Sequence, residues 1–237
     1  MSLLTIVQYV CGRQNLTVPS TVIGSTDEQV LQLRRLLEEE GQDLSARAQW
    51  QVLQHQATLT TTATESQGLM SVLAPEGFRF IINNTIWSRT RRLPVSGPMD
   101  AREWQELKAM FVNGPYYRHR IRGNELLVNP TPPAGEDWAF EYVSYNWIVD
   151  SVGTTYKRYF SADDDEPLLD EGLLISGLRW RWKKEKGLDY AEDFRTYEDQ
   201  VKDAIGRDGG KRPVYMDLST EHTGPAVFVP AGNWSVP

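Results

Sequence analysis

The side chains that could form a nucleophilic or metal site are few and widely separated. The chain has three histidines, His55, His119 and His222, and a single cysteine, Cys11. A thiol beside an imidazole can act as a nucleophile, but Cys11 falls on the apolar face of a predicted helix, where a cysteine is usually a buried, inert thiol. No His-x-x-x-His or Cys-x-x-Cys spacing indicates zinc. We therefore predict no catalytic residue, no metal and no cofactor.

An acidic run, Asp163-Asp164-Asp165-Glu166, is the best remaining candidate for a cation site. It lacks the spaced ligands and central glycine of an EF-hand loop, so a solvated helix start is the preferred interpretation. Paired carboxylates for glycoside cleavage remain an open alternative, because sequence does not give the separation between acids.

A basic and aromatic segment, residues 179–184, suggests nucleic-acid binding. On a helix, Trp180 and Trp182 point about 200° apart, so they do not form one stacking platform. We expect Trp182 in the core, and Trp180 with its basic neighbours over an adjacent subunit or the helix end. A second cluster of arginines leaves binding to DNA ends open as a third interpretation. The net charge of −7 argues against extensive binding to DNA phosphates. The members of this cluster are Arg89, Arg91, Arg92, Arg118, Arg120 and Arg122.

Helical patterns begin and end the chain, and strand-like patterns fill its middle. Apolar residues recur at helical spacing over residues 2–13, 27–48 and 167–186, and again from Asp189 onwards. Between about 50 and 150, β-branched and aromatic residues predict strands, with one helix opening at the capping box Asp100-x-x-Glu103.

The simplest packing joins the terminal helices, since each has a single apolar stripe to bury. We therefore predict an α+β fold in which the N- and C-terminal helices form an antiparallel bundle, interrupted by a β-rich insert and followed by an extended C-terminal arm. The predicted domains are a discontinuous helical bundle (1–49 and 150–207), a β-rich insert with one helix (50–149) and the arm (208–237).

The C-terminal segment is rich in proline and glycine, yet it carries apolar groups. From His222 to Pro237 it has no charged side chain. Such a strip suits strand addition or insertion into a groove of a partner, and packing on its own subunit is the open alternative. The predicted partner-binding residues are Tyr215, Val227, Phe228, Val229 and Trp234.

Several segments together resemble the head-to-tail adaptor proteins of short-tailed bacteriophages, also called connector or tail tubular A-like proteins. The resemblance covers most of residues 1–210. It rests on the order and the residue composition of the following segments. They are Leu3–Gln8 with Cys11-Gly12, Val22–Asp27, Ile82–Trp87, Gly97-Pro98, and Gly177–Lys184 continuing to Gly187–Ala191.

The resemblance implies a non-enzymatic virion protein at the head–tail junction, assembled in the host cytoplasm. Identical subunits would form a ring under the portal protein, expected to be a dodecamer, that supports the tail nozzle or tail tubular proteins. DNA would pass through the lumen without sequence-specific binding, and no membrane is involved. The alternative is a tail-associated carbohydrate-binding or hydrolytic protein. The candidates for contacts between subunits are Asp163, Asp164, Arg179, Trp180, Arg181 and Lys184.

Overall fold

The structure is a computed structural model that describes residues 1–109 and 116–209. Within these residues the chain forms six α-helices, one short 3-10 helix and eleven strands. The helices are α1 (Leu3–Arg13), α2 (Glu28–Arg47), η1 (Gln51–Leu53), α3 (Met70–Leu73), α4 (Ala101–Ala109), α5 (Glu171–Glu185) and α6 (Ala191–Asp208). The strands are β1 (Gln54–Thr60), β2 (Ser66–Leu69), β3 (Phe80–Ile81), β4 (Trp87–Ser88), β5 (Leu93–Pro94), β6 (Arg118–Arg122), β7 (Glu125–Asn129), β8 (Asp137–Val143), β9 (Ile148–Val149), β10 (Tyr156–Lys157) and β11 (Glu166–Pro167).

Side-chain caps fix where the long helices begin. Ser2 caps α1, Asp27 caps α2 through the backbone N–H of Gln29, and Asp170 caps α5. Each cap accepts a hydrogen bond from a backbone N–H that has no partner within the helix. The helix predicted over 167–186 therefore begins later, because Asp170 rather than the acidic run provides its cap.

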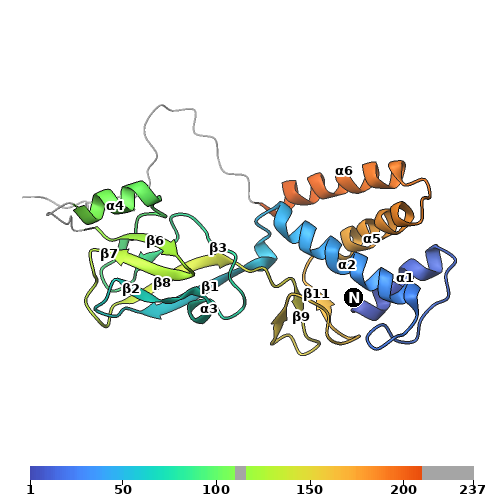
Figure 1. Cartoon of the computed structure of the whole chain (residues 1–237), viewed down its shortest axis with the longest axis horizontal. Helices are drawn as coiled ribbons and strands as arrows, with labels where there is room; N and C mark the ends of the chain where they lie inside the picture. Colours follow the sequence, from blue (N-terminus) through green and yellow to red (C-terminus); the bar gives the residue numbers. More distant parts are fainter. Residues whose placement is uncertain (110–115, 210–237) are drawn as a thin grey trace, which may run out of the picture.

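Helix α5 lies at the centre of the helical part of the molecule. It contacts α1, α2 and α6, and Figure 1 shows these four helices gathered at one end. A helix with neighbours on several sides buries more than one stripe, so both Trp180 and Trp182 are buried. The core they join also includes five residues of the chain that leads back from the sheets: Val143, Trp147, Ile148, Phe160 and Leu169.

Three antiparallel sheets form the rest of the fold. In the largest, β1 pairs with β8 over seven residue pairs, and β3, β4 and β5 complete the sheet beyond β8. The second sheet has the order β2-β7-β6, and the third has the order β10-β9-β11. The predicted hairpin around Arg122-Gly123-Asn124 is confirmed as β6 and β7, with Gly123 and Asn124 at positive φ.

Helix α4 begins at the predicted capping box. Asp100 accepts from the Glu103 N–H at 2.7 Å, and Glu103 accepts from the Asp100 N–H at 3.2 Å. The helix covers the second sheet, where Trp104 and Leu107 pack against Leu127. A separate core lies under the largest sheet, including Phe140 and Tyr142.

The predicted fold class is wrong. Helices are not confined to a bundle of the chain ends, since α3 and α4 lie among the strands. Strands are not confined to one insert, since β10 and β11 lie in the stretch assigned to helices. The fold is α+β with mixed content. Strands of two residues have no periodicity that a sequence can reveal, which explains the error. The predicted C-terminal arm lies outside the described residues apart from its first two positions, and the domain boundaries stay a prediction.

His119 on β6 is the most strongly shifted histidine of the described residues. It is 1% exposed, Nδ1 lies 3.0 Å from the Ser96 carbonyl oxygen, and Nε2 has no hydrogen-bond partner. A Cβ at Gly97 would lie 2.6 Å from Nδ1, so only glycine fits above the ring. Burial lowers the pKa of His119 to about 4, against an opposing effect of hydrogen bonds to the backbone.

This shift predicts a loss of stability in mild acid. The folded pKa lies below the unfolded value of 6.5, so the contribution is complete above pH 6.5 and is lost as the pH falls towards 4. Between pH 7 and about pH 4.5 it should amount to about 2 kcal/mol. The contribution is measured by urea unfolding of the parent and of His119→Gln at both pH values. An equal pH dependence in the two proteins would contradict the assignment.

Candidate functional site

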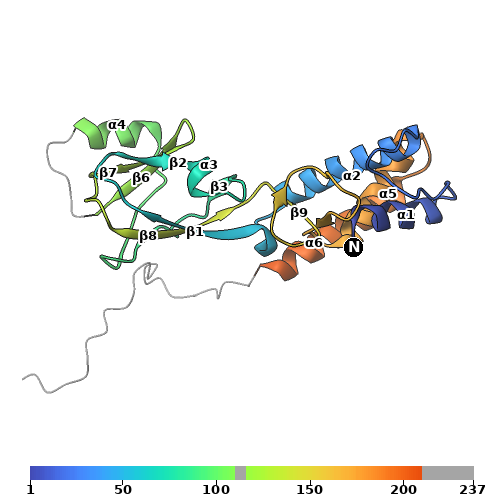
Figure 2. The ribbon, with the colours of Figure 1, turned by 90° about the horizontal axis from the view of Figure 1, so that it is seen from below.

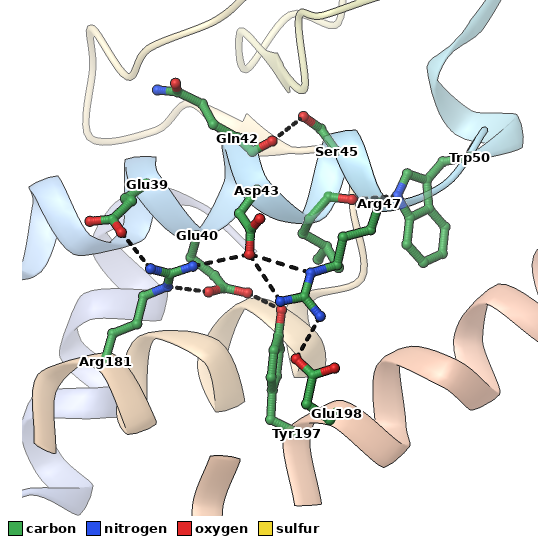
Figure 3. Close-up of polar contacts among 11 residues, drawn as sticks. Glu39, Glu40, Gln42, Asp43, Ser45, Arg47, Trp50, Arg181, Tyr197 and Glu198 are labelled. Atoms are coloured by element: carbon green, nitrogen blue, oxygen red, sulfur yellow. Dashed lines mark hydrogen bonds and ion pairs between the residues drawn. The ribbon is translucent and has the colours of Figure 1, made fainter. Parts of the chain in front are cut away.

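A fully buried carboxylate lies where α2, α5 and α6 meet. Glu40 is 0% exposed, yet it stands on the stripe of α2 that otherwise carries Leu33, Leu37 and Leu44 into the core. A buried charge is costly unless it is paired and hydrogen-bonded. The side chains that surround Glu40 meet both conditions (Figure 3). We call them, with Glu40 itself, the Glu40 cluster: Glu39, Glu40, Asp43, Arg47, Arg181, Tyr197 and Glu198.

Arg181 of α5 connects three acids of α2. Its Nε donates to Glu40 at 2.5 Å, while its two terminal nitrogens donate to Glu39 at 2.5 Å and to Asp43 at 3.1 Å. The guanidinium has donors in a fixed planar fork, which suits several carboxylates at once. The interaction attaches α5 to successive turns of α2.

Helix α6 is attached to α2 by two neighbouring residues. The Tyr197 hydroxyl donates to the second oxygen of Glu40, and Glu198 accepts from Arg47 at 2.6 Å. Arg47 also donates to Asp43 at 3.0 Å, so Asp43 joins the Arg181 and Arg47 halves of the cluster. All three helices are therefore held through one connected set of charges.

Glycines make room for this close approach. A Cβ at Gly177 of α5 would lie 2.3 Å from the Glu40 carboxyl carbon, and a Cβ at Gly41 of α2 would lie 2.2 Å from the Trp147 ring. Glycine has a low helix propensity, so by local sequence alone Gly41 should weaken α2. In the structure it is the contact that lets the chain leaving the sheets pack against α2.

The electrostatics of the cluster favour a fixed structure over chemistry. Burial raises the pKa of Glu40, while the bonds from Tyr197 and Arg181 act in the opposite direction. Burial and the neighbouring Glu40 charge raise the pKa of Tyr197 well above its ordinary value, so the hydroxyl keeps its proton and donates. Both carboxylate oxygens of Glu40 accept hydrogen bonds, and the side chain is fully buried. Over residues 1–109 and 116–209, no group of three or more His, Cys, Asp or Glu side chains could hold a metal ion.

The predicted subunit contacts on α5 all have partners within the chain. Arg181 belongs to the Glu40 cluster, and Arg179 pairs with Asp193 of α6. Trp180 is 7% exposed and meets the Phe194 ring edge-on at 5.0 Å. Lys184 is exposed, with its Nζ 5.8 Å from the Trp180 ring centre.

The acidic run holds loops in place instead of starting a helix. Asp163 accepts from the backbone N–H groups of Val22 and Ile23, which lowers its pKa despite an opposing effect of burial. Asp165 is buried and pairs with Lys157 at 2.6 Å. Asp164 is exposed. The solvated helix start is therefore wrong for two of these acids, because each closes a specific loop.

Two expectations for aromatic residues have different outcomes. Trp182 is buried, as its position on the stripe predicted. The helical spacing from Asp189 onwards predicts that Phe194 shares an inward face with Tyr197 and Val201. That prediction is wrong: Phe194 is 37% exposed, since Tyr197 and Val201 fill the contact of α6 with the core. The proposed partner-binding residues Tyr215, Val227, Phe228, Val229 and Trp234 lie outside the described residues.

Sequence reasoning missed the Glu40 cluster. The sequence contains two signals. A glutamate takes the place of an apolar residue on the buried stripe of α2, and a glycine, Gly177, lies in the middle of α5. Neither identifies the partner, because Arg181 and Tyr197 are more than 140 residues away along the chain.

Comparison with known proteins gives no relative: no family model and no curated protein sequence matches the chain. In the part of the chain that the structure describes, no helix is long and apolar enough to cross a membrane.

Replacing Tyr197 with phenylalanine tests the cluster directly. Tyr197→Phe removes the donor to a buried Glu40 oxygen, and we expect a loss of about 1–3 kcal/mol in the free energy of unfolding. Tyr190→Phe, on an exposed ring next to α6, is the matched control and should leave stability unchanged. Chemical denaturation of the three proteins gives the values. Equal stability of Tyr197→Phe and the parent would show that the hydroxyl is not a required partner.

Replacing Gly177 with alanine tests the close approach of α2 and α5. Alanine normally stabilises a helix by up to ~1 kcal/mol relative to glycine. Here we expect a loss of about 1–3 kcal/mol, because the added methyl group overpacks the Glu40 side chain. Gly206→Ala on α6 is the control, since nothing lies within 4 Å of its Cβ position. Thermal or chemical unfolding should give opposite signs for the two substitutions.

Proposed function

We propose that this chain is a structural head-to-tail adaptor of a tailed phage virion and not an enzyme. Copies of it form a ring, a dodecamer by the family resemblance, that docks under the portal, extends the DNA channel and supports the tail proteins. DNA passes through the lumen without sequence-specific binding. The protein is assembled in the host cytoplasm and resides at the head–tail junction.

The observation that carries the proposal is an apolar patch on a rigid support. Leu188, Tyr190 and Phe194 are exposed where α5 turns into α6, and the rings of Tyr190 and Phe194 lie 6.4 and 5.0 Å from that of buried Trp180. Exposed aromatic side chains are enriched in protein interfaces. The Glu40 cluster fixes both helices beneath them, so the patch presents a constant shape to a neighbouring copy.

Charges of both signs surround this patch. Lys184 and Lys186 are exposed at the end of α5, and Glu192 is exposed at the start of α6. In a ring, a patch on one subunit meets a different surface of the next, and each contact recurs around the axis. Among the predicted contact residues, Lys184 and Asp164 have exposed side chains and form the fewest interactions within their own chain.

Attachment to the portal is assigned to the C-terminal segment on its sequence. Residues 222–237 carry apolar groups between prolines and have no charged side chain. Several such segments arriving together at one portal ring gain affinity from their high effective concentration.

Co-sedimentation with portal rings of the encoding phage tests this function. We expect the parent chain to bind the rings, and Phe228→Ala combined with Trp234→Ala to reduce binding at least about tenfold, as expected for interface hot spots. Val72→Ala combined with Val152→Ala truncates two exposed apolar side chains elsewhere and should bind as the parent does; these side chains are 72% and 77% exposed. A parent chain that does not sediment with the portal would refute the adaptor function.

A further inference from the structure

Strand β1 is an edge of the largest sheet, and its outer side has no partner in the described residues. Leu53 and Thr61, on either side of β1, form backbone bonds with Ser144 and Glu136 next to β8. Hydrogen-bonding direction alternates along an antiparallel strand, so the odd-numbered residues of β1 face β8. The N–H and C=O groups of the even-numbered residues point away from the sheet. The Gln54 N–H donates to the Gln51 carbonyl oxygen, and no described backbone or side-chain group bonds to the backbone groups of Gln56, Thr58 and Thr60.

This edge lacks the features that normally prevent strand addition. Proteins protect exposed edges with prolines, charged side chains, bulges or short strands. β1 has seven residues, Gln-His-Gln-Ala-Thr-Leu-Thr, with no proline and no charged group, and its register with β8 is unbroken. By comparison, the short edge strand β2 carries a bulge between Ser66 and Gly68. An open and regular edge is a template for another strand.

The described chain ends beside this edge. The Asp208 carboxylate at the end of α6 accepts from the Gln51 N–H at 2.9 Å, three residues before β1 begins. Gly209 lines a hollow of about 650 Å³ together with Gln54, His55 and Gln56. Figure 2 shows the end of α6 close to the start of β1. The described chain therefore ends next to the first residues of the open strand.

The next part of the sequence has the alternation of a strand. Val214, Met216 and Leu218 alternate with Tyr215 and Asp217, and Pro213 precedes them. Four residues separate Gly209 from Val214, which allows a reach of at most about 18 Å between their Cα atoms. Buried and exposed side chains also alternate along β1: Ala57 and Leu59 face the core, and the even-numbered residues face solvent.

We propose that residues 214–218 of the same chain add to the outer edge of β1 as a parallel strand. The direction is parallel because the segment starts at the N-terminal end of β1. Val214, Met216 and Leu218 then extend the apolar face of Ala57 and Leu59, while Tyr215 and Asp217 lie on the face of Thr58. The inference does not depend on the adaptor function, and it leaves residues 219–237 for partner binding.

Disulfide trapping tests this placement. In a Cys11→Ala background, Thr58→Cys is combined in turn with Tyr215→Cys, Asp217→Cys and Ser219→Cys. Adjacent strands bring Cα atoms within disulfide range, which is about 4.4–6.8 Å. We expect one of the three pairs to oxidise to a cross-linked monomer, while Thr58→Cys with Met216→Cys, on opposite faces, does not. A disulfide-linked dimer would assign the strand to a second copy and overturn the same-chain proposal, and the absence of any cross-link would also overturn it.

Amide hydrogen exchange on the full chain gives an independent readout. Met216→Pro removes a backbone donor from the proposed strand, and the N–H groups of Gln56 and Thr58 should exchange at least about tenfold faster than in the parent. Ala231→Pro, outside the proposed strand, is the control and should leave their exchange unchanged. Retained protection of Ala57 and Leu59 shows that the sheet is intact. Gln56 and Thr58 amides that already exchange rapidly in the parent would overturn the proposal.

Discussion

The buried charge of Glu40 is the constraint on which the helical part of this protein depends. A carboxylate with no exposure is stable only if every partner is in place, so α5 must supply Arg181 and α6 must supply Tyr197. The glycine at position 177 follows from the same constraint, because the carboxylate occupies the space of its side chain. Removing either partner would leave a buried charge without compensation, so the positions of the three helices depend on one another.

The rest of the fold is connected to this interface through α2 and through the chain leaving β8. Trp147 lies on Gly41, and its ring meets Phe160 edge-on at 5.3 Å, so the third sheet and its loops pack against the helices. β1 and β8 carry the chain between the helices and the sheets, and their seven residue pairs form the longest ladder of the described fold. The two main cores thus meet along one pair of strands.

A protein organised in this way is suited to holding surfaces at fixed positions. The buried acids Glu40, Glu136 and Asp165 each pair with a basic side chain. Leu188, Tyr190 and Phe194 are exposed where α5 turns into α6, above a rigid interface. The proposed adaptor function uses this patch between copies and the C-terminal segment towards the portal. A strand added to β1 would make the sheet a support for that segment.

The sequence by itself determined those helices and turns that have a clear hydrophobic periodicity, a capping residue or a turn motif. The positions of the long helices, the box at Asp100 and Glu103, and the hairpin at Gly123 could all be predicted, because residues within a few positions decide them. The short strands β9, β10 and β11 and the exposure of Phe194 could not, since they depend on how whole elements pack. The Glu40 cluster is the clearest case. The sequence showed a glutamate among leucines, but only the tertiary structure brought Arg181 and Tyr197 to it, because a buried charge is satisfied by residues distant along the chain.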